Sequence, residues 1–373
     1  MLDNENANEI RVLHVIRHMN VGGAETFIMN MYRNLDKNKI QFDFLVFGEG
    51  YFDAEIKSLG GKIFVMKYLT EIGEIKFRSN LIDFFKSHSE YRIVHSHLDQ
   101  VSGIILESAK KANVKYRISH SHNTRNANGF LGKVYKKYLQ SKINKNANFL
   151  FACGESAAKW LFNSKYNEAI IINNGIDIEK FKFSSNNRNE IRKEFNINKD
   201  TILLGHVGRF TKQKNHKFII DIYREYIRVN SNSKLILIGE GKLKGKIQQY
   251  VKKNKLQDKV MFLGLRDDVC KIYSAMDCLI FPSLYEGLSV ALIEAQISGL
   301  NIIGTDTIDK KTDISGNITW MSLKSNCCEW AKKIKVTKAE NRKLLSDKVK
   351  EYDIKNVTKK MENIYLNMYK DKI

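Results

Sequence analysis

Short apolar runs alternate with longer amphipathic segments along the chain, and the alternation occurs in two series. Each run has the length of a β-strand and is apolar on both faces, which is the pattern of strands buried inside a parallel sheet. The first series covers residues 11–17, 42–47, 63–66, 92–95, 116–119 and 149–152. The second series covers residues 201–207, 234–238, 259–263, 277–281 and 301–304.

Helical patterns separate the strands within each series, so each series predicts a doubly wound α/β sheet. The polar stretch 173–200 lies between the two series. We therefore predict two Rossmann-like domains, at residues 1–178 and 179–354, followed by a C-terminal helix at residues 355–373. The basic segment 331–350 is also predicted to be helical.

Length and composition agree with two domains. A chain of 373 residues is too long for one ordinary core, and a hydrophobic content of 43% is enough for two. We find no apolar run of about 18 residues, and the first residues are polar and acidic, so neither a transmembrane span nor a secretion signal is expected. The five cysteines lack metal-type spacing and are predicted to be reduced thiols of a cytoplasmic protein.

The net charge of +21 has several interpretations. Nucleic acid, an anionic membrane surface and phosphorylated substrates all attract a basic protein, and a Lys- and Asn-rich proteome would produce the same excess without any function. No nucleic-acid-binding module is recognisable. Residues 111–150 interleave lysines with apolar residues, which fits either a helix adsorbed to anionic lipid or a core helix with a solvated lysine face.

The segment 281–300 carries the strongest candidate chemistry. A turn leads from a buried strand into a helix whose N-cap is predicted at Ser289, and the free amides of that helix start attract phosphate. Glu286 lies in the loop before the helix and Glu294 about one turn inside it. The two carboxylates are too far apart to act on one bond and suit two parts of one long ligand. Two surface glutamates on an ordinary strand-turn-helix unit are the alternative.

Two further strand ends carry residues suited to phosphate. Arg209 and Lys214 follow the first strand of the second series and can together neutralise a departing diphosphate, although solvated loop cations fit the same pattern. Gly22 and Gly23 follow the first strand of the first series and open a helix, where they would let a ligand approach the backbone. The third glycine of the dinucleotide fingerprint is absent, which argues against an NAD-dependent oxidoreductase.

Histidines end two strands of the first series. Strand alternation puts His120 and His122 on one side of the chain, and His122 is the better placed of the two to bind a sugar hydroxyl, with a purely structural role as the alternative. Asp267 and Asp268 are adjacent and are predicted to start a helix, so no D-x-D loop holds a metal diphosphate. We therefore expect metal-free neutralisation of the phosphates.

Taken together, the motifs resemble those of glycosyltransferase family 4, a retaining family with the GT-B fold. The likeness covers nearly the whole chain and is carried, in order, by VGGAE, ISHSHNT, NNGID, GRFTKQKN, LIGEGKLK, FLGLRDDV and PSLYEGLSVALIEA. It implies two Rossmann-like domains facing across a cleft, with the acceptor held mainly by residues 1–178 and the nucleotide-sugar by residues 179–354. It also implies that the helix at residues 355–373 crosses back to the N-terminal domain.

The resemblance implies roles for particular residues. Arg209 and Lys214 would contact the diphosphate, Glu286 would contact the donor sugar, and His122 would lie near that sugar, so these four form the predicted catalytic set. The predicted donor-binding set would lie against the phosphates, the sugar, the ribose and the base, and consists of Gly22, Gly23, Leu265, Arg266, Gly287, Leu288, Ser289 and Glu294. No metal site and no cofactor is implied.

We therefore predict a retaining, metal-independent glycosyltransferase of the hexosyltransferase type. It would move a sugar from a nucleotide-sugar, with a UDP-sugar as the first choice, to a glycan or lipid-linked glycan acceptor in the biosynthesis of a cell-surface polysaccharide such as a capsule or exopolysaccharide. We expect a cytoplasmic protein that can associate peripherally with the inner face of an anionic membrane and that does not bind nucleic acid. A nucleotide-sugar epimerase or glycoside phosphorylase of the same architecture, and a non-catalytic partner subunit, are the alternatives.

Overall fold

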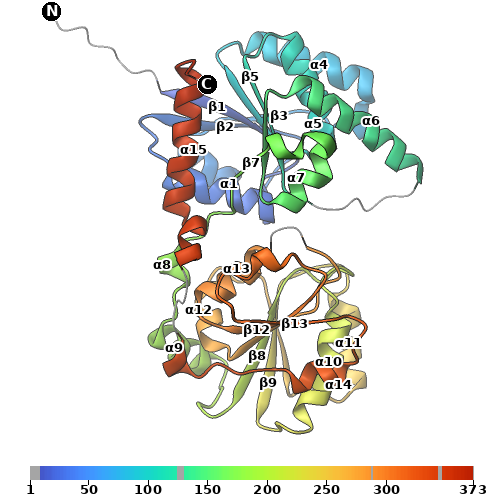
Figure 1. Cartoon of the computed structure of the whole chain (residues 1–373), viewed down its shortest axis with the longest axis vertical. Helices are drawn as coiled ribbons and strands as arrows, with labels where there is room; N and C mark the ends of the chain where they lie inside the picture. Colours follow the sequence, from blue (N-terminus) through green and yellow to red (C-terminus); the bar gives the residue numbers. More distant parts are fainter. Residues whose placement is uncertain (1–8, 124–129, 287–288, 343–346, 373) are drawn as a thin grey trace, which may run out of the picture. The chain divides into compact units, whose positions relative to one another are not determined.

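The computed structural model describes residues 9–123, 130–286, 289–342 and 347–372, and within these ranges the side chains of residues 130–133 are not described. The chain divides into two compact units. The first combines Met1–Gly175 with Glu351–Ile373, and the second is Ile176–Lys350. Each unit has its own sheet and its own cores, so each is described by itself (Figure 1).

The first unit is built on a parallel sheet with the strand order β3-β2-β1-β4-β5-β6-β7. The hydrogen-bonded pairs are all parallel, which requires a crossover between strands that are consecutive in the chain. The strands are β1 (Ile10–Val15), β2 (Ile40–Val46), β3 (Ile63–Val65), β4 (Ile93–Ser96), β5 (Tyr116–Ser121), β6 (Phe149–Ala152) and β7 (Ile170–Ile171).

Helices cover both faces of this sheet. Because side chains alternate along a strand, Val12 of β1 packs in the core beneath α1 and α15, whereas its neighbour Leu13 packs in the core beneath α4 and α5 (Figure 1). The helices are α1 (Gly23–Asn34), α2 (Asp53–Ser58), α3 (Leu69–Ile72), α4 (Glu74–Ser87), α5 (Ser102–Lys111), α6 (Phe130–Asn146), α7 (Glu155–Phe162) and α15 (Ile354–Tyr369), with 3-10 turns η1 (Asp99–Val101) and η2 (Asn163–Glu168).

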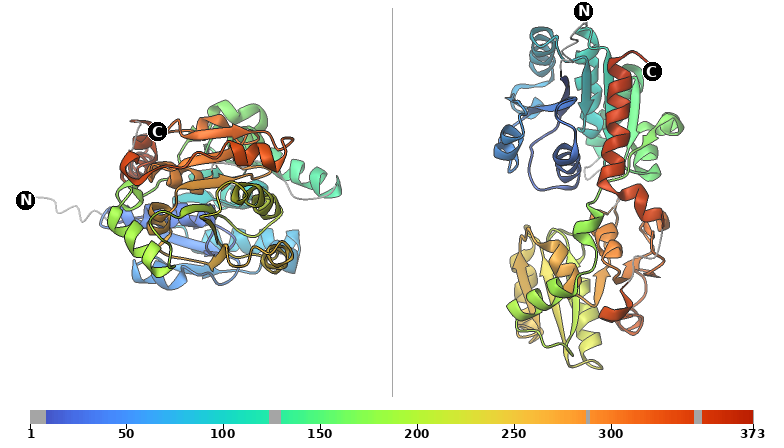
Figure 2. Two further views of the ribbon diagram at one scale, coloured as in Figure 1. Left: turned by 90° about the horizontal axis from the view of Figure 1, so that it is seen from below. Right: turned by 90° about the vertical axis from the view of Figure 1, so that its left-hand side faces the viewer.

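The C-terminal helix α15 belongs to the first unit, which confirms the prediction that the end of the chain returns to the N-terminal domain (Figure 2). Its buried residues Val357, Met361, Tyr365 and Met368 recur at helical spacing and form one face in the core of that unit. Gly175 lies against the start of this helix, where an added Cβ would sit 2.5 Å from Cδ1 of Ile354. The first core is therefore incomplete without the last segment of the chain.

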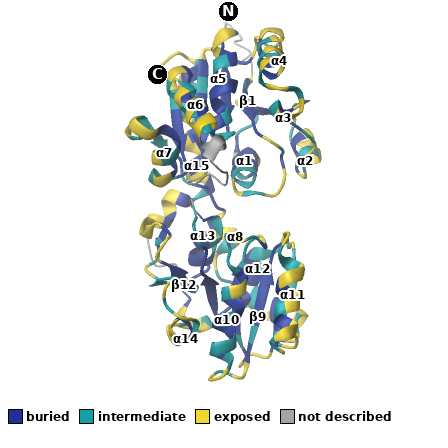
Figure 3. Ribbon diagram, turned by 90° about the vertical axis from the view of Figure 1, so that its right-hand side faces the viewer, coloured by how far each residue is buried: buried dark blue, intermediate teal, exposed yellow. Residues whose placement is uncertain are grey.

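The second unit has a parallel sheet with the order β10-β9-β8-β11-β12-β13. Its strands are β8 (Ile202–Val207), β9 (Ser233–Ile238), β10 (Val260–Gly264), β11 (Cys278–Phe281), β12 (Asn301–Thr305) and β13 (Ile318–Met321). Its helices are α8 (Ile178–Phe181), α9 (Ser185–Glu194), α10 (His216–Ile227), α11 (Lys244–Lys253), α12 (Val269–Ala275), α13 (Val290–Ile297) and α14 (Cys327–Lys332), with 3-10 turns η3 (Lys310–Thr312), η4 (Ala339–Asn341) and η5 (Asp347–Tyr352). In both units the strands are largely buried, while the outer faces of helices such as α6 and α11 are exposed (Figure 3).

The predicted α/β class and the pair of Rossmann-like sheets are confirmed. Two strands were missed by the hydrophobic pattern. β7 has only two residues, and β13 has three half-buried residues, so neither forms the continuous apolar run that marks the other strands.

The prediction of a helix over residues 331–350 is wrong. The described part of the segment after α14 is mostly irregular because its polar groups bind the starts of β11 and β12 and the end of α12 instead of one another. The backbone N–H of Thr337 donates to the carbonyl of Asp277 at 2.8 Å, and Oγ1 of Thr337 accepts from the backbone of Asn301 at 2.8 Å. Arg342 donates to the carbonyl oxygen of Tyr273 at 2.9 Å and to that of Met276.

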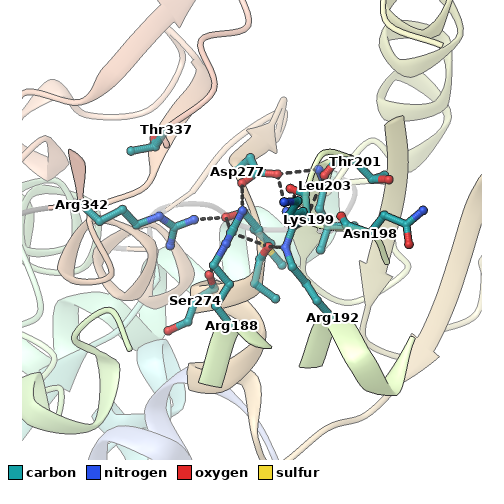
Figure 4. Close-up of polar contacts among 12 residues, drawn as sticks. Arg188, Arg192, Asn198, Lys199, Thr201, Leu203, Ser274, Asp277, Thr337 and Arg342 are labelled. Carbon is teal, nitrogen blue, oxygen red and sulfur yellow. Dashed lines mark hydrogen bonds and ion pairs between the residues drawn. The ribbon is translucent and has the colours of Figure 1, made fainter. Parts of the chain in front are cut away.

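Asp277, at the start of β11, is the centre of a buried polar cluster in the second unit (Figure 4). Its carboxylate accepts from Arg188 at 2.7 Å and from Arg192 at 2.6 Å, both on α9, and from the backbone N–H of Leu203 at 2.7 Å. These bonds attach the leading helix of the unit to the middle of its sheet.

Candidate functional site

The loop between β11 and α13 holds the central part of the predicted donor site. Ser289 is the N-cap of α13, as predicted, but its side chain makes no capping hydrogen bond and is only 4% exposed. The amides at the start of α13 therefore lack a side-chain cap at Ser289 and can bind an anion. Gly287 and Leu288 lie outside the described residues.

The loop after β8 is hydrogen-bonded to this loop. The backbone N–H of Leu284 donates to the carbonyl of Gln213 at 2.8 Å, and Nε2 of Gln213 donates to the carbonyl of Tyr285 at 2.9 Å. Nδ2 of Asn215 donates to the carbonyl of Pro282 at 3.3 Å. Two motifs that lie about seventy residues apart in the sequence are thus one structural unit at the carboxyl end of the sheet.

Lys214 and Glu286 form an ion pair within this unit. Nζ of Lys214 lies 2.7 Å from Oε1 of Glu286, and the two side chains are only 14% and 8% exposed. The ammonium also lies 4.7 Å from the centroid of the Phe281 ring. The attraction within an ion pair shielded from water is stronger than within a surface pair, so Glu286 holds the Lys214 ammonium at a fixed place between the two loops.

Arg209 lies in the same loop and is exposed. It follows Gly208, whose carbonyl oxygen would be 2.4 Å from a Cβ added at Gly239. The backbone of Gly239 also has a φ of +132°, which residues with a side chain rarely adopt. Both the clash and this φ require glycine, which lets the ends of β8 and β9 come together next to Arg209. Arg209 is therefore presented at the surface of the loop that also carries the half-buried Lys214.

Several buried polar atoms in the same region have no hydrogen-bond partner among the described residues. They are Oγ of Ser283, Nε2 of His206, and both ring nitrogens of His216. Burial lowers the pKa of His216 to about 4 and lowers that of His206 well below its ordinary value, so both rings are neutral at physiological pH. Since buried polar groups are normally paired, a cluster of unpaired atoms indicates a place where water or a polar ligand binds.

Glu294 lies on α13, about one turn after Ser289. Burial raises the pKa of Glu294 to about 7, although the hydroxyl of Tyr273, 3.2 Å from Oε2, and the charge of Lys180 favour the ionised form. A half-buried carboxyl group of this kind suits hydrogen bonding to hydroxyl groups more than it suits binding a phosphate.

Leu265 and Arg266 follow β10. Leu265 is 64% exposed and offers an apolar surface. Arg266 is engaged in ion pairs with Asp268 at 2.7 Å and Glu194 at 2.9 Å, which raise its pKa above the ordinary value. The apolar surface for a base would therefore come from Leu265, while the guanidinium of Arg266 holds the surrounding loop.

In the first unit, Gly22 is the N-cap of α1 and Gly23 is its first residue. A Cβ at Gly22 would lie 2.3 Å from Oε2 of Glu25, whereas a Cβ at Gly23 would meet no atom within 4 Å. The close contact at Gly22 involves only the end of the flexible Glu25 side chain, so local packing does not require glycine there. The open space at Gly23 fits close approach by a ligand.

His122 lies at the end of β5, and its Nε2 is 2.9 Å from Nδ1 of His97. Sequence reasoning found the histidines at the ends of β4 and β5. It missed His14 on β1 and Tyr365 on α15, each of which is hydrogen-bonded to one of them. The strand register could have indicated His14, because it pairs directly with His95. Nothing in the local sequence indicates Tyr365, which comes from the other end of the chain.

Within the described part of the chain, no helix is both long and apolar enough to cross a bilayer.

Two Rossmann-like sheets, with an uncapped helix start and a shielded lysine at the carboxyl end of the second, are the features of a GT-B glycosyltransferase. Two family models match the chain: "Glycosyltransferase Family 4" over residues 21–180 and "Glycosyl transferases group 1" over residues 187–317. The putative glycosyltransferase EpsF of Bacillus subtilis is 36% identical over 337 residues, which cover 88% of each chain. The chain therefore belongs to glycosyltransferase family 4.

Two more distant proteins are similar over most of their length. The UDP-Gal:α-D-GlcNAc-diphosphoundecaprenol α-1,3-galactosyltransferase of Escherichia coli is 23% identical and covers 79% of each chain. Among solved structures, that of HepE of Anabaena in complex with UDP-glucose superposes with a TM-score of 0.77 at 15% identity, covering 95% of this chain and 98% of HepE. This last likeness shows the fold alone.

Proposed function

We propose that the protein is a retaining glycosyltransferase that moves a sugar from a UDP-sugar to a glycan or lipid-linked glycan acceptor in the biosynthesis of a cell-surface polysaccharide. The observation that carries this proposal is the arrangement around α13, where the Lys214–Glu286 pair stands near an uncapped helix start and several unpaired polar atoms. The names of two similar proteins support it, since one uses UDP-Gal on a diphosphoundecaprenol-linked sugar and the other binds UDP-glucose.

The proposed reaction replaces one bond at the anomeric carbon by another on the same face of the sugar. The bond to the diphosphate oxygen breaks, the bond to the acceptor oxygen forms, and the leaving diphosphate oxygen takes the acceptor proton. Arg209, Lys214 and the amides at the start of α13 stabilise the negative charge that grows on the diphosphate. Glu286 is released from Lys214 when the diphosphate arrives and accepts hydrogen bonds from the sugar hydroxyls.

In this proposal the cationic side chains and the amides at the start of α13 neutralise the diphosphate, as a divalent metal ion does in other transferases. The proposal therefore includes metal independence, and no cofactor besides the nucleotide-sugar substrate.

The lysine-bearing helix α6 supports peripheral association with an anionic membrane, where a lipid-linked acceptor would be found. Val134, Tyr135 and Tyr138 on this helix are exposed to 61%, 39% and 49%. Exposed aromatic and apolar side chains beside lysines suit the interface of an anionic bilayer.

The test is a thermal-shift screen of the purified protein with UDP, GDP, ADP and their sugars, each with and without EDTA. We expect UDP and one UDP-sugar to raise the Tm most, by the same amount in EDTA. A larger shift with GDP would replace the assigned base, and no shift with any nucleotide would contradict the proposal. Consumption of the donor sugar without an acceptor, by conversion to its epimer, would identify an epimerase instead.

A further inference from the structure

Five of the nine histidines in the chain gather on one face of the sheet in the first unit. The strand register explains this, because β1, β4 and β5 are neighbours and His14 pairs with His95 across β1 and β4. Residues two apart on an extended chain point to the same face, so His97, just after β4, joins His95, and His122, just after β5, joins His120. This is the face that α1 and α15 cover.

The rings form two hydrogen-bonded rows. In the His122 row, Nδ1 of His14 lies 3.0 Å from Nε2 of His97, and Nδ1 of His97 lies 2.9 Å from Nε2 of His122. In the Tyr365 row, the hydroxyl of Tyr365 lies 2.7 Å from Nδ1 of His95, and Nε2 of His95 lies 3.1 Å from Nδ1 of His120.

A metal site is the first alternative to consider, because two groups of three histidines have ring nitrogens within 4.8 Å of one another. An ion bound by imidazole lies in the plane of each ring, along the nitrogen lone pair. The rings here are stacked instead. His120 and His122 are 28° from parallel with centroids 4.1 Å apart, and His95 and His97 are 27° from parallel at 4.2 Å. Stacked rings cannot direct their lone pairs at one point, so the geometry favours the hydrogen-bonded rows.

Each ring in the His122 row is neutral, because burial lowers the pKa of His14 and His122 to about 3 and that of His97 well below its ordinary value. A neutral imidazole has one N–H, so three rings supply three N–H groups for two hydrogen bonds. The third N–H must lie at one end of the row, either on Nε2 of His14 or on Nδ1 of His122. The tautomers of the three rings are thus linked.

The two ends of the row differ in their surroundings. The ring of His14 packs against that of Phe42, with the two ring centroids 4.2 Å apart, and its buried Nε2 has no hydrogen-bond partner in the described structure. His122 is only half-buried, and its Nδ1 has no partner among the described residues. Orphaned buried N–H groups are rarer than unpaired acceptors, so the N–H belongs at the end that water or a ligand can reach.

We propose that His14 and His97 are positioning residues that hold His122 as the Nδ1–H tautomer, so that His122 donates a hydrogen bond to an oxygen atom of the bound ligand. The identity of that ligand as the donor sugar rests on the proposed function. The tautomer does not, because it follows from contacts within the first unit alone. Because the row ends in the core at His14, this arrangement places its third N–H on Nδ1 of His122.

The test measures the tautomer directly in the full chain without any nucleotide. In protein labelled with ¹⁵N-histidine, long-range ¹H–¹⁵N correlation distinguishes a protonated ring nitrogen from a bare one, and the His122→Gln variant assigns the His122 signals by their loss. We expect Nδ1 of His122 to carry the hydrogen. A hydrogen on Nε2 of His122 would overturn the proposal.

Two variants of His97 separate positioning from packing. The amide nitrogen of Asn can replace Nδ1 as a donor to His122, whereas Leu fills space without donating. We expect His97→Asn to keep the His122 tautomer and His97→Leu to lose it, with the donor KM raised ~10-fold in His97→Leu and a smaller change in kcat, which is the loss of one hydrogen bond. Equal tautomers in both variants would contradict the positioning role.

Two controls distinguish the other outcomes. Stoichiometric Zn²⁺ should leave the histidine signals unchanged, and if it shifts all the ring signals at one equivalent, the cluster is a metal site and the proposal is wrong. If His122 carries its hydrogen on Nδ1 but no nucleotide-sugar binds, the proposed function is wrong and the assigned tautomers of His14, His97 and His122 remain correct.

Discussion

In the proposed mechanism, a diphosphate that enters the second unit competes with Glu286 for Lys214. The pair is shielded from water, so neither charge is well solvated, and the arriving phosphate would replace Glu286 as the counter-charge of Lys214. Under this proposal Lys214 serves two states: it pairs with Glu286 before the donor binds, and it stabilises the leaving group once the donor is bound.

At this residue scale we predict that Lys214→Ala lowers kcat by a hundredfold or more, because loss of one electrostatic contact to a transition state costs ~3 kcal/mol. Turnover with the donor found by the thermal-shift screen is the measurement. Lys212→Ala removes an exposed lysine from the same loop and should leave turnover nearly unchanged. Near-normal turnover of a folded Lys214→Ala protein would contradict the assignment.

Glu294 gives a prediction about pH. Its pKa is raised from 4.5 to about 7 in the folded protein, so the folded state holds the proton more tightly than the unfolded state does. The stability that this group contributes is present below pH 4.5 and is lost as the pH rises through 7.

Glu294→Gln should remove this loss. Relative to the natural protein, the variant should gain up to roughly 3 kcal/mol in free energy of unfolding between pH 4.5 and pH 8, since one pKa unit corresponds to ~1.4 kcal/mol. Urea unfolding at the two pH values measures it. Glu329→Gln, at an exposed position of the same unit, is the matched control variant. A constant difference between Glu294→Gln and the natural protein would show that burial does not raise this pKa.

At the scale of the elements, the attachment of α9 to the sheet depends on the carboxylate of Asp277. Asp277 is paired with Arg188 and Arg192, whose side chains are 13% and 6% exposed. Asp277→Asn leaves both guanidinium groups without their counter-charge, and we expect it to destabilise the second unit by about 3–5 kcal/mol in denaturant unfolding. Asp258→Asn changes an exposed aspartate of the same unit and should have little effect. A loss below about 1 kcal/mol for Asp277→Asn would mean that water replaces the carboxylate.

The helix α6 gives a prediction about membrane binding. Val134→Ser combined with Tyr138→Ser removes exposed apolar surface and keeps every lysine. If α6 inserts at the interface, binding to vesicles containing anionic lipid should fall ~10-fold, because both apolar burial and charge contribute to adsorption. Ile75→Ser, on α4 and 88% exposed, is the matched control. Unchanged binding by the double variant would mean that charge alone, or another surface, holds the protein.

At the scale of the whole molecule, the second unit is one continuous segment, whereas the first is made from both ends of the chain. We expect the fragment 176–350 to unfold cooperatively and to keep its Tm shift with UDP. The fragment 1–175 lacks α15, so the core beneath that helix is exposed and the fragment should be insoluble or lack cooperative unfolding. Fusion of 351–373 to this fragment through a flexible linker should restore folding. A cooperative, soluble 1–175 fragment would show that α15 is dispensable.

The sequence alone was sufficient for the class of fold and for the place of the candidate chemistry. Strands and helices are recognisable because hydrophobic residues recur along the sequence about every 2 residues in a strand and about every 3.6 residues in a helix. Parallel sheets bind ligands at the carboxyl ends of their strands, so Arg209, Lys214, Glu286 and Ser289 could be assigned to one edge before any contact was known.

The tertiary structure alone decided which of these residues touch one another. Whether Lys214 pairs with Glu286, whether residues 331–350 form a helix, and whether His122 belongs to a row that begins at His14 all depend on contacts between distant parts of the chain. Such contacts depend on strand register and on the packing of helices over the sheet. The hydrophobic periodicity of a local segment does not contain this information. The local sequence therefore determines the helices, the strands and the reactive side chains that they carry. Tertiary packing determines which side chains are hydrogen-bonded or ion-paired to one another, and in which protonation state.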